Sequence, residues 1–446
     1  MSKARNFIIT YKKTEFDLND ASEIVASCYD RSADKADIVD KESLIRDMHH
    51  CKEPGLSVVQ LSDEMSTLLK NHSFIANIIE DFEFSLPQPD YSPIGPPEKV
   101  DSLPWDWNIR MINASKAWEK NLTGNGVTIA VVDTGIDIRN QPTLASRVIG
   151  GISYADGKES TDPHSWQDTY GHGTLCAGIM ATPKIENSAV GVAQNASLYS
   201  VKITDSKTIK MSNLVKGMQW IIGECKGGNR IDIASMSVGL DLSRIITGDT
   251  ENGLTELERL VQSLLEQNCL VVAPVGNNGN KRGETLSVTY PAHMEGVLGV
   301  GAVDTTGKWW SSSSWEKGKD WVNITAPGVG IFENWTGVDP ALPHDGTCFS
   351  CAHTSGAAAL VIEYLEKQNQ PYTTEMVAAI LEESALDIDG LGRDSRTGAG
   401  ILNCDFSISV AESLVESLNV EHMLYKKKSV RDIVEQKIGQ SSHPDN

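Results

Sequence analysis

Four residues in this sequence carry side chains able to do chemistry and stand in glycine-rich surroundings. Asp133 lies in VTIAVVDTGID, His172 in GHGTLCAG, Asn277 in VVAPVGNNGN and Cys348 in GTCFSCAHTSG. A thiol, an imidazole and a carboxylate are groups that nucleophilic catalysis combines. Each segment also has a structural interpretation when taken singly, because Asp-Thr-Gly and Asn-Gly form turns and glycines beside a histidine allow close backbone packing.

The elements that would position these residues alternate between short apolar strands and helices over residues 105–404. Strands rich in β-branched residues are predicted in VTIAVVDTG, ASLYSVKIT, DIASMSVG, CLVVAPVG and VLGVGAVD. Continuous apolar strands that alternate with helices indicate a parallel sheet covered on both faces. Active sites of such sheets lie at the carboxyl ends of the strands, which is where Asp133 and Asn277 stand.

The four segments occur in the order aspartate, histidine, asparagine, nucleophile, and together they resemble the motifs of the subtilisin-like serine proteases, or subtilases. The stretches MSNLVKGMQWII, ASMSVGL and TYPAHMEGVLGVGAVD extend the resemblance, which covers roughly residues 105–405. The family implies an α/β fold with a doubly wound parallel sheet. It also implies an endopeptidase that hydrolyses peptide bonds through an acyl-enzyme and requires no cofactor.

The resemblance implies a role for each of the four residues. His172 is the general base, Asp133 holds it in the correct tautomer, and Cys348 stands at the position of the attacking serine. The side-chain amide of Asn277 and the backbone N–H of Cys348 would bind the oxyanion, a contact worth about 3–4 kcal/mol in such sites.

The same resemblance assigns residues that would hold a peptide or protein substrate. Two backbone edges are expected to pair with an extended substrate strand, and an S1 pocket is expected to accept medium or large uncharged side chains. The edges are Ser237, Val238 and Gly239 on one side and Met211 to Leu214 on the other, and the pocket is lined by Ala273 and Thr289.

Cys348 is the main departure from the family pattern. A thiol ionises far more readily than an alcohol, so His172 would hold the sulfur as a thiolate, yet a cleft shaped for oxygen is not tuned for sulfur. Proteolysis is therefore expected to be weakened or arrested. A thioester-forming peptide ligase and a peptide-binding pseudoprotease remain as alternatives. The cysteine fits a natural cysteine subtilase or an engineered replacement that arrests self-cleavage, and the retained N-terminal unit favours the second.

The eight cysteines form no dense disulfide framework and no zinc motif, so no metal site is predicted from them. Cys348 and Cys351 make a C-x-x-C sequence that could be a redox pair, although the flanking residues favour a nucleophile helix. Cys176 follows His172 by one helical turn, where some relatives have a free thiol. It is expected to pack under the histidine or to make the protein sensitive to mercurials.

Four regions are expected along the chain. Residues 1–85 read as a ferredoxin-like α+β unit with Ser62 as a helix N-cap, and this unit resembles the subtilase propeptide, an intramolecular chaperone and inhibitor. Residues 86–104 hold six prolines and form a linker with the processing site. The catalytic domain takes residues 105–408. Residues 409–446 form a helical, charged extension, either a docking helix or a solvated one, of which we favour the second.

The formal charge of −21 argues against a nucleic-acid partner, because phosphate binding needs a basic face. No apolar run is long enough to span a membrane, so no membrane partner is expected. The N-terminus lacks the apolar stretch of a signal peptide, which favours a cytoplasmic protein unless a signal has been removed. A structural calcium ion is doubtful, because the loop ENSAVGVAQ is shorter than in the calcium-binding relatives.

Overall fold

The computed structural model describes residues 5–12, 18–32, 41–46, 48–51, 56–85, 106–155, 159–184, 190–241, 250–279, 288–332 and 343–419. Within this part of the chain, seven parallel strands form the central sheet, in the order β13-β12-β11-β10-β6-β8-β7. The strands are β6 (Thr128–Asp133), β7 (Val148–Ser153), β8 (Ser197–Lys202), β10 (Ile233–Met236), β11 (Leu270–Pro274), β12 (Leu298–Val303) and β13 (Ile324–Pro327). The predicted doubly wound parallel sheet is confirmed.

The direction of winding reverses between β6 and β10, which are neighbours in the sheet. Later strands of the chain follow β10 on one side, and β8 and β7 follow β6 on the other. In open α/β sheets, a crevice for ligands opens outside the carboxyl ends of the strands at such a reversal. Asp133 ends β6 and Ser237 follows β10, so both residues lie at this point.

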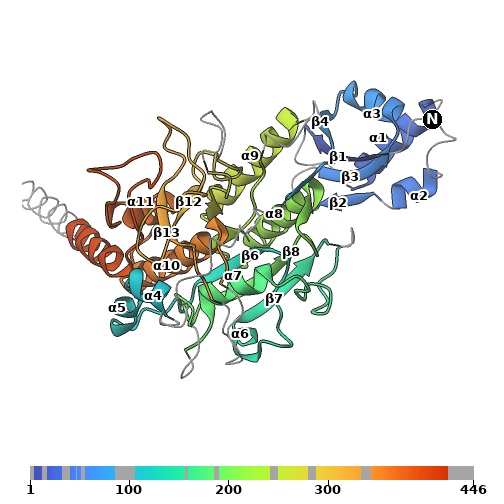
Figure 1. Cartoon of the computed structure of the whole chain (residues 1–446). Coiled ribbons are helices and arrows are strands. Elements are labelled where there is room, and N and C mark those ends of the chain that lie inside the picture. The colour runs from blue at the N-terminus through green and yellow to red at the C-terminus, as the bar shows by residue number, and fades with distance from the viewer. Residues whose placement is uncertain are drawn as a thin grey trace, which may run out of the picture.

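Helices cover both faces of the sheet (Figure 1). On one face α7 (His172–Ala181) and α10 (Thr347–Lys367) share a core with the strands, because nearly every side chain of both helices is buried. On the other face α8 (Met211–Lys226) and α9 (Thr250–Glu266) pack through one apolar stripe each. Shorter helices are α4 (Trp107–Met111), α5 (Ala114–Glu119), α6 (Pro142–Ala145) and α11 (Thr374–Glu383).

The N-terminal residues fold around a separate antiparallel sheet of order β2-β3-β1-β4. This order and these directions are those of the expected ferredoxin-like arrangement. Ser62 caps its second long helix by accepting a hydrogen bond from Met65 N at 3.2 Å, as predicted. The elements are β1 (Arg5–Tyr11), α1 (Leu18–Arg31), α2 (Lys41–Arg46), β2 (His49–Cys51), β3 (Leu56–Leu61), α3 (Asp63–Lys70) and β4 (Ile75–Glu80).

The N-terminal sheet lies against α8 and α9, as Figure 1 shows. After β4 the chain forms the short strand β5 (Glu83–Ser85), which pairs antiparallel with β9 (Thr208–Lys210) of the larger unit. Ile8, Leu56 and Phe84 belong to the same buried cluster as the apolar stripes of α8 and α9. The two units therefore share hydrophobic surface. The linker expected at residues 86–104 lies outside the described residues.

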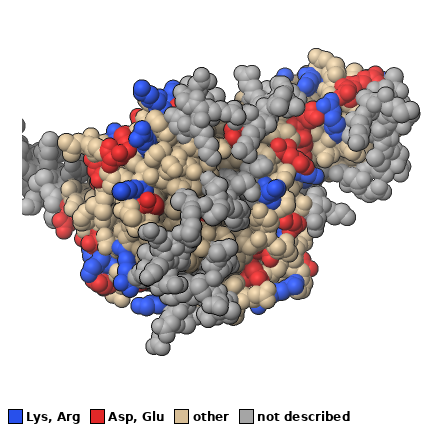
Figure 2. All heavy atoms as spheres, in the orientation of Figure 1, with Lys and Arg blue, Asp and Glu red and all other residues tan. Residues whose placement is uncertain are grey.

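A C-terminal helix occupies residues 404–419 of the described chain. Ile408, Ala411 and Val415 are buried in the cluster that also contains α10, and Lys120 of the preceding region forms an ion pair with Glu412 at 2.8 Å. The favoured solvated extension is therefore wrong for residues 409–419, because an apolar stripe docks this helix on the domain. No helix within the described ranges is long and apolar enough to cross a membrane. On the face shown in Figure 2, basic side chains are scattered among acidic ones.

Candidate active site

The structure brings Asp133 and His172 into direct contact. Nδ1 of His172 lies 2.8 Å from Oδ1 and 3.0 Å from Oδ2 of Asp133, and both side chains are buried. The helix that carries His172 passes so close to the end of β6 that a side chain on Gly173 would lie 2.3 Å from the carbonyl oxygen of Gly135. The glycine predicted to allow close packing therefore lets the imidazole reach the carboxylate.

The start of α7 is held by polar side chains that the sequence did not single out. Asp168 accepts hydrogen bonds from the backbone N–H groups of Tyr170, Gly171 and Thr174. Thr134 accepts a further one from Gly173 N at 2.9 Å. Because these bonds satisfy the first N–H groups of the helix, they fix the position from which His172 projects.

The electrostatic surroundings of His172 favour its protonated form. Burial is the largest influence and lowers the pKa of the imidazole, but the Asp133 carboxylate together with the Cys176 and Cys348 thiols more than offsets it. The pKa of His172 is therefore raised well above its ordinary value. Nε2 of the same ring is buried and has no hydrogen-bond partner among the described residues. Nε2 is therefore the atom left to exchange a proton with a nucleophile or a substrate.

Cys348 is the second residue of α10, and its side chain is 1% exposed. Its thiol donates a hydrogen bond to the carbonyl oxygen of Ser237 at 3.6 Å. The thiol is close enough to His172 to contribute to the raised pKa of the imidazole. The structure thus brings Asp133, His172 and Cys348 together, with the sulfur within hydrogen-bonding distance of the Ser237 carbonyl oxygen and close to the imidazole.

Asn277 follows β11 and is locked to the start of α10. Its side-chain oxygen accepts hydrogen bonds from the backbone N–H of Thr347 at 3.0 Å and from the Thr347 hydroxyl at 2.8 Å. These two bonds direct the NH₂ group of Asn277 away from Thr347, and Nδ2 lies 3.5 Å from the point where a side chain on Gly346 would begin. The geometry places an amide donor beside the first turn of the helix that carries Cys348.

Comparison with known proteins agrees with this geometry. Residues 124–400 match the model of the peptidase S8 family, described as the subtilase family. The chain is 32% identical over 307 residues to Subtilisin Savinase of Lederbergia lenta, covering 69% of this chain and 98% of that protein. The chain belongs to the subtilase family. It is therefore a subtilisin-like peptidase at the level of the family.

Two further relatives match different shares of this chain. Subtilisin E of Bacillus subtilis (strain 168) is 33% identical over 307 residues, covering 69% of this chain and 71% of that protein. M-protease of Shouchella clausii (strain KSM-K16) is 30% identical over 367 residues, covering 82% of both chains. That share is more than residues 105–446 contain, so the M-protease match extends into the first 104 residues.

The two segments expected to flank a substrate in this subtilase have different secondary structure. Ser237, Val238 and Gly239 form an extended segment after β10, beside the Cys348 thiol. Met211 and Leu214 lie in the first turn of α8 with buried side chains, so the expected strand edge is wrong at these residues. The strand at this place is β9, which ends one residue before Met211.

The two residues expected to line an S1 pocket lie on and after β11. Ala273 is fully buried in the core, and Thr289 is 3% exposed. The Thr289 hydroxyl donates to the carbonyl oxygen of Pro274 at 3.1 Å, so its polar group is satisfied internally. Both residues lie near the carboxyl end of the strand that leads to Asn277, and their contact with a substrate stays a prediction.

Aromatic side chains next to the nucleophile were missed by the sequence analysis. The ring of Phe349 lies 5.9 Å from that of His172 and 6.0 Å from that of His344, measured between centroids. Phe349 therefore fills the space between the base and the segment that precedes α10. Its position directly after Cys348, in the first turn of the helix, was the available signal, because side chains in a first turn face the neighbouring element.

Within the described residues, one group of three side chains could hold a metal ion, namely Asp133, His172 and Cys176, whose ligand atoms lie within 4.8 Å of one another. Two of the three are already joined by the hydrogen bond at the catalytic centre. Part of the loop considered for calcium, residues 185–189, lies outside the described residues. Subtilases work without a catalytic cofactor, and nothing in this donor set calls for one.

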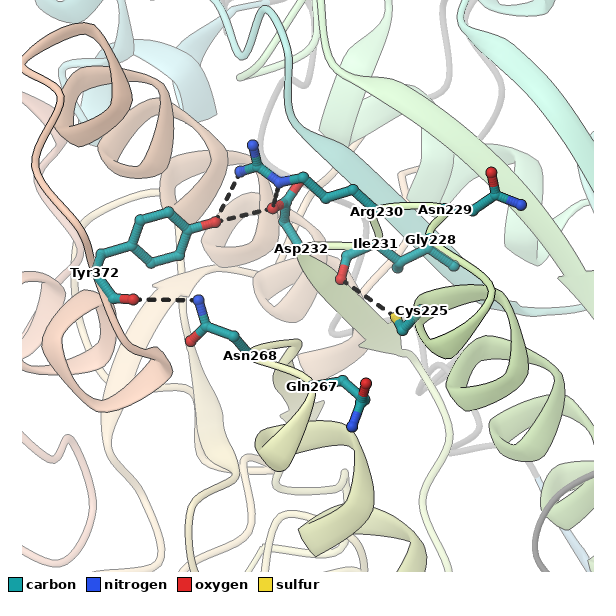
Figure 3. A pocket seen from close by; sticks show the side chains of 9 residues that line it. All are labelled: Cys225, Gly228, Asn229, Arg230, Ile231, Asp232, Gln267, Asn268 and Tyr372. Carbon is teal, nitrogen blue, oxygen red and sulfur yellow. Dashed lines mark hydrogen bonds and ion pairs between the residues drawn. The ribbon is translucent and has the colours of Figure 1, made fainter.

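A separate pocket of about 280 Å³ lies at the other end of the sheet, before β10 (Figure 3). Arg230 in this pocket donates to Asp232 at 2.5 Å and to the Tyr372 hydroxyl at 2.8 Å, and Tyr372 donates to Asp232 at 2.9 Å. Asn268 binds the carbonyl oxygen of Tyr372 at 3.2 Å. These polar groups bind one another, so the pocket is a structural junction between the end of α8 and the segment before α11.

Proposed function

We propose that this chain is the zymogen of a subtilisin-like endopeptidase in which Cys348 is the nucleophile. The observation that carries the proposal is the Asp133–His172 hydrogen bond of 2.8 Å beside a thiol in the first turn of α10. A peptide-binding protein without catalysis has no need of an oriented general base, which argues against a pseudoprotease.

The reaction follows from the placement of these groups. The sulfur of Cys348 attacks the carbonyl carbon of the peptide, and the thiol proton passes to Nε2 of His172. The oxyanion that forms accepts hydrogen bonds from the amide of Asn277 and the backbone N–H of Cys348. When the C–N bond breaks, His172 returns the proton to the leaving amine. Water, deprotonated by His172, then attacks the thioester and releases the acid and the thiol.

We expect peptide hydrolysis to be slower with sulfur as the nucleophile than with oxygen in a site of this shape. The thiol of Cys348 points at the Ser237 carbonyl and must rotate before it can pass its proton to His172. Sulfur is also larger than oxygen, so it moves the substrate carbonyl away from the oxyanion donors, and a displacement of about 1 Å can cost about 100-fold in rate.

The N-terminal unit, residues 1–85, is proposed to be a propeptide that inhibits the catalytic domain, residues 105–408, through its last strand. β5 pairs with β9 as an extended peptide would, and Asp81 accepts hydrogen bonds from the backbone N–H of Ser212 at 2.9 Å and from its hydroxyl at 2.6 Å. A carboxylate at a helix N-terminus is favoured by the helix dipole. The M-protease match extends into the first 104 residues, so that relative has a counterpart to part of this region.

The substrate is proposed to be a peptide or protein that binds as an extended strand. β9, now occupied by β5, would supply one edge, and Ser237 to Gly239 would supply the other. Ala273 and Thr289 would border the S1 pocket. Neither carries a charge, which favours uncharged side chains at the bond to be cut.

The test is the intact mass of the full chain over time, beside Cys348→Ser and Cys348→Ala. We expect the serine form to split between residues 84 and 104 and then to digest an unfolded protein, while the native chain stays largely whole and digests it slowly. The alanine form should do neither. If no form cuts the protein, the endopeptidase assignment is wrong. If an added amine acceptor yields more ligated than hydrolysed product, the protein is a thioester ligase.

A further inference from the structure

The C-x-x-C sequence has no part in the reaction proposed above, yet its two thiols lie on one turn of one helix. Cys348 and Cys351 are the second and fifth residues of α10. Residues three apart in an α-helix have Cα atoms about 5 Å apart. Disulfides span Cα separations of about 4.4–6.8 Å, so the backbone of α10 already holds these cysteines at bonding distance.

Both sulfurs also face the same strand. The Cys348 thiol donates to the carbonyl oxygen of Ser237 at 3.6 Å, and the Cys351 sulfur lies 3.8 Å from the hydroxyl of Ser235. Cys351 donates to the carbonyl oxygen of Val272 at 3.4 Å, and the Ser237 hydroxyl is within its hydrogen-bonding reach. The two side chains therefore converge on the end of β10 and do not diverge around the helix.

Both thiols are buried, but they differ in charge environment. Cys348 stands in the first turn of α10, where the helix dipole favours an anion, and it lies beside the protonated form of His172. Cys351 is fully buried, and burial raises its pKa to about 12. Cys348 is thus the thiol that an oxidant would attack. Cys351 is a protonated thiol one turn further along the same helix.

We propose that Cys348 and Cys351 form a reversible disulfide that switches the nucleophile off. A peroxide oxidises the Cys348 thiolate to a sulfenic acid and is reduced to water or an alcohol. The Cys351 thiol then attacks this sulfur, the S–S bond forms, and the hydroxyl group leaves as water with the Cys351 proton. A dithiol reductant restores both thiols and is itself oxidised to a disulfide. The effect on activity rests on the proposed role of Cys348, whereas the disulfide itself does not.

A third thiol competes for the same oxidised sulfur. Cys176 belongs to α7, is fully buried, and lies close enough to Cys348 for each to affect the charge of the other. Its sulfur lies within 4.8 Å of a ligand atom of His172 and of Asp133, and the Ser237 hydroxyl is within its hydrogen-bonding reach. Cys351 shares a rigid turn with Cys348 and Cys176 does not, so Cys351 is the expected partner.

The test is disulfide mapping of the full chain after treatment with hydrogen peroxide. Free thiols are alkylated in denaturant, the protein is digested without reduction, and the peptide spanning residues 346–356 is weighed. We expect it to resist alkylation at both cysteines, to be lighter by two hydrogens, and to return to two alkylated thiols after dithiothreitol. Peptidase activity should be lost and regained in parallel.

Two variants make the outcome decisive. Cys351→Ser should form no disulfide and should pass to a sulfinic acid on Cys348 that dithiothreitol does not reverse, whereas the matched control Cys176→Ala should behave as the native chain. A native chain that gives the sulfinic acid, or a Cys348–Cys176 disulfide, overturns the proposal. Because mapping needs no activity, a chain that forms the disulfide but cuts no peptide would refute the proposed function and leave the redox site intact.

Discussion

The helix α7 begins at His172, the proposed base, and carries Cys176 one turn later. The helix α10 carries Cys348, the proposed nucleophile, as its second residue and Cys351 one turn later. In α7 the imidazole of His172 is held through Nδ1 by Asp133, and the start of the helix is held by Asp168 and Thr134. In α10 the backbone start is fixed by Asn277, but the Cys348 thiol has one long contact to a carbonyl oxygen. The proposed base and the proposed oxyanion donor are each held by two hydrogen bonds, and the departure from the family pattern lies at Cys348.

The largest effect should follow from removing the base that α7 positions. In His172→Ala we expect kcat/KM for peptide hydrolysis to fall about 10³-fold or more, because neither the thiol nor the leaving amine then has a proton partner. The matched control is His164→Ala, at an exposed histidine of the same region, which should change kcat/KM little. Equal losses in the two variants would mean that His172 acts only through the fold.

Removing the oxyanion donor should have the next largest effect. In Asn277→Ala we expect kcat to fall about 10²–10³-fold with little change in KM, since the amide binds charge that develops after substrate has bound. Asn278→Ala is the control, because its neighbouring amide binds Asp241 at 3.0 Å and stands outside the reaction. A loss expressed in KM and not in kcat would contradict the assigned role.

The pH dependence of kcat/KM should differ between the native chain, with a sulfur nucleophile, and Cys348→Ser, with an oxygen nucleophile. The raised pKa of His172 means that the imidazole stays protonated to a higher pH than usual. A serine needs the neutral imidazole, so kcat/KM of Cys348→Ser should rise only as the pH passes this raised pKa. A cysteine that reacts as a thiolate does not need the neutral imidazole, so under the proposed mechanism the native chain should keep its activity to lower pH. Coincident acid limbs in the two profiles would show that Cys348 does not react as part of such an ion pair.

The smallest effect concerns the contact of the N-terminal unit with α8. In Asp81→Ala we expect a loss of about 1 kcal/mol in the free energy that holds β5 on β9, because the first N–H groups of α8 lose an acceptor. Hydrogen–deuterium exchange of the full chain should then be faster in β9. Asp81→Asn retains an acceptor oxygen and should be affected less. Unchanged exchange in both variants would show that the apolar contacts alone hold the unit in place.

Much of the fold and of the catalytic centre could be predicted from the sequence because the signals are local. Asp133 and Asn277 each directly follow an apolar strand, and His172 is flanked by the glycines that let α7 approach β6. Parallel strands bring such ends to one edge of the sheet. The contact between Asp133 and His172 depends on the close approach of α7 to the end of β6, whereas Asn277 binds Thr347 at the start of α10.

The features that were missed depend on residues distant in the sequence. Met211 to Leu214 were expected to form a backbone edge beside the substrate, but α8 begins at Met211, directly after Lys210 and without a side-chain cap of its own. The cap comes from Asp81, 131 residues earlier. The C-terminal helix that carries Val415 likewise packs on a surface that includes α10, and this surface forms only when α10 has folded. Neither partner can be identified from a local pattern of residue types.

The most direct test of the central claim is to trap the acyl-enzyme during turnover of a peptide substrate. Rapid acid quenching followed by digestion and mass analysis should reveal an acyl group on the peptide that contains Cys348, and hydroxylamine should remove it as it removes a thioester. Cys348→Ala should show neither adduct nor product. Peptide cleavage by Cys348→Ala, or an adduct on another residue, would contradict the assignment of Cys348 as the nucleophile.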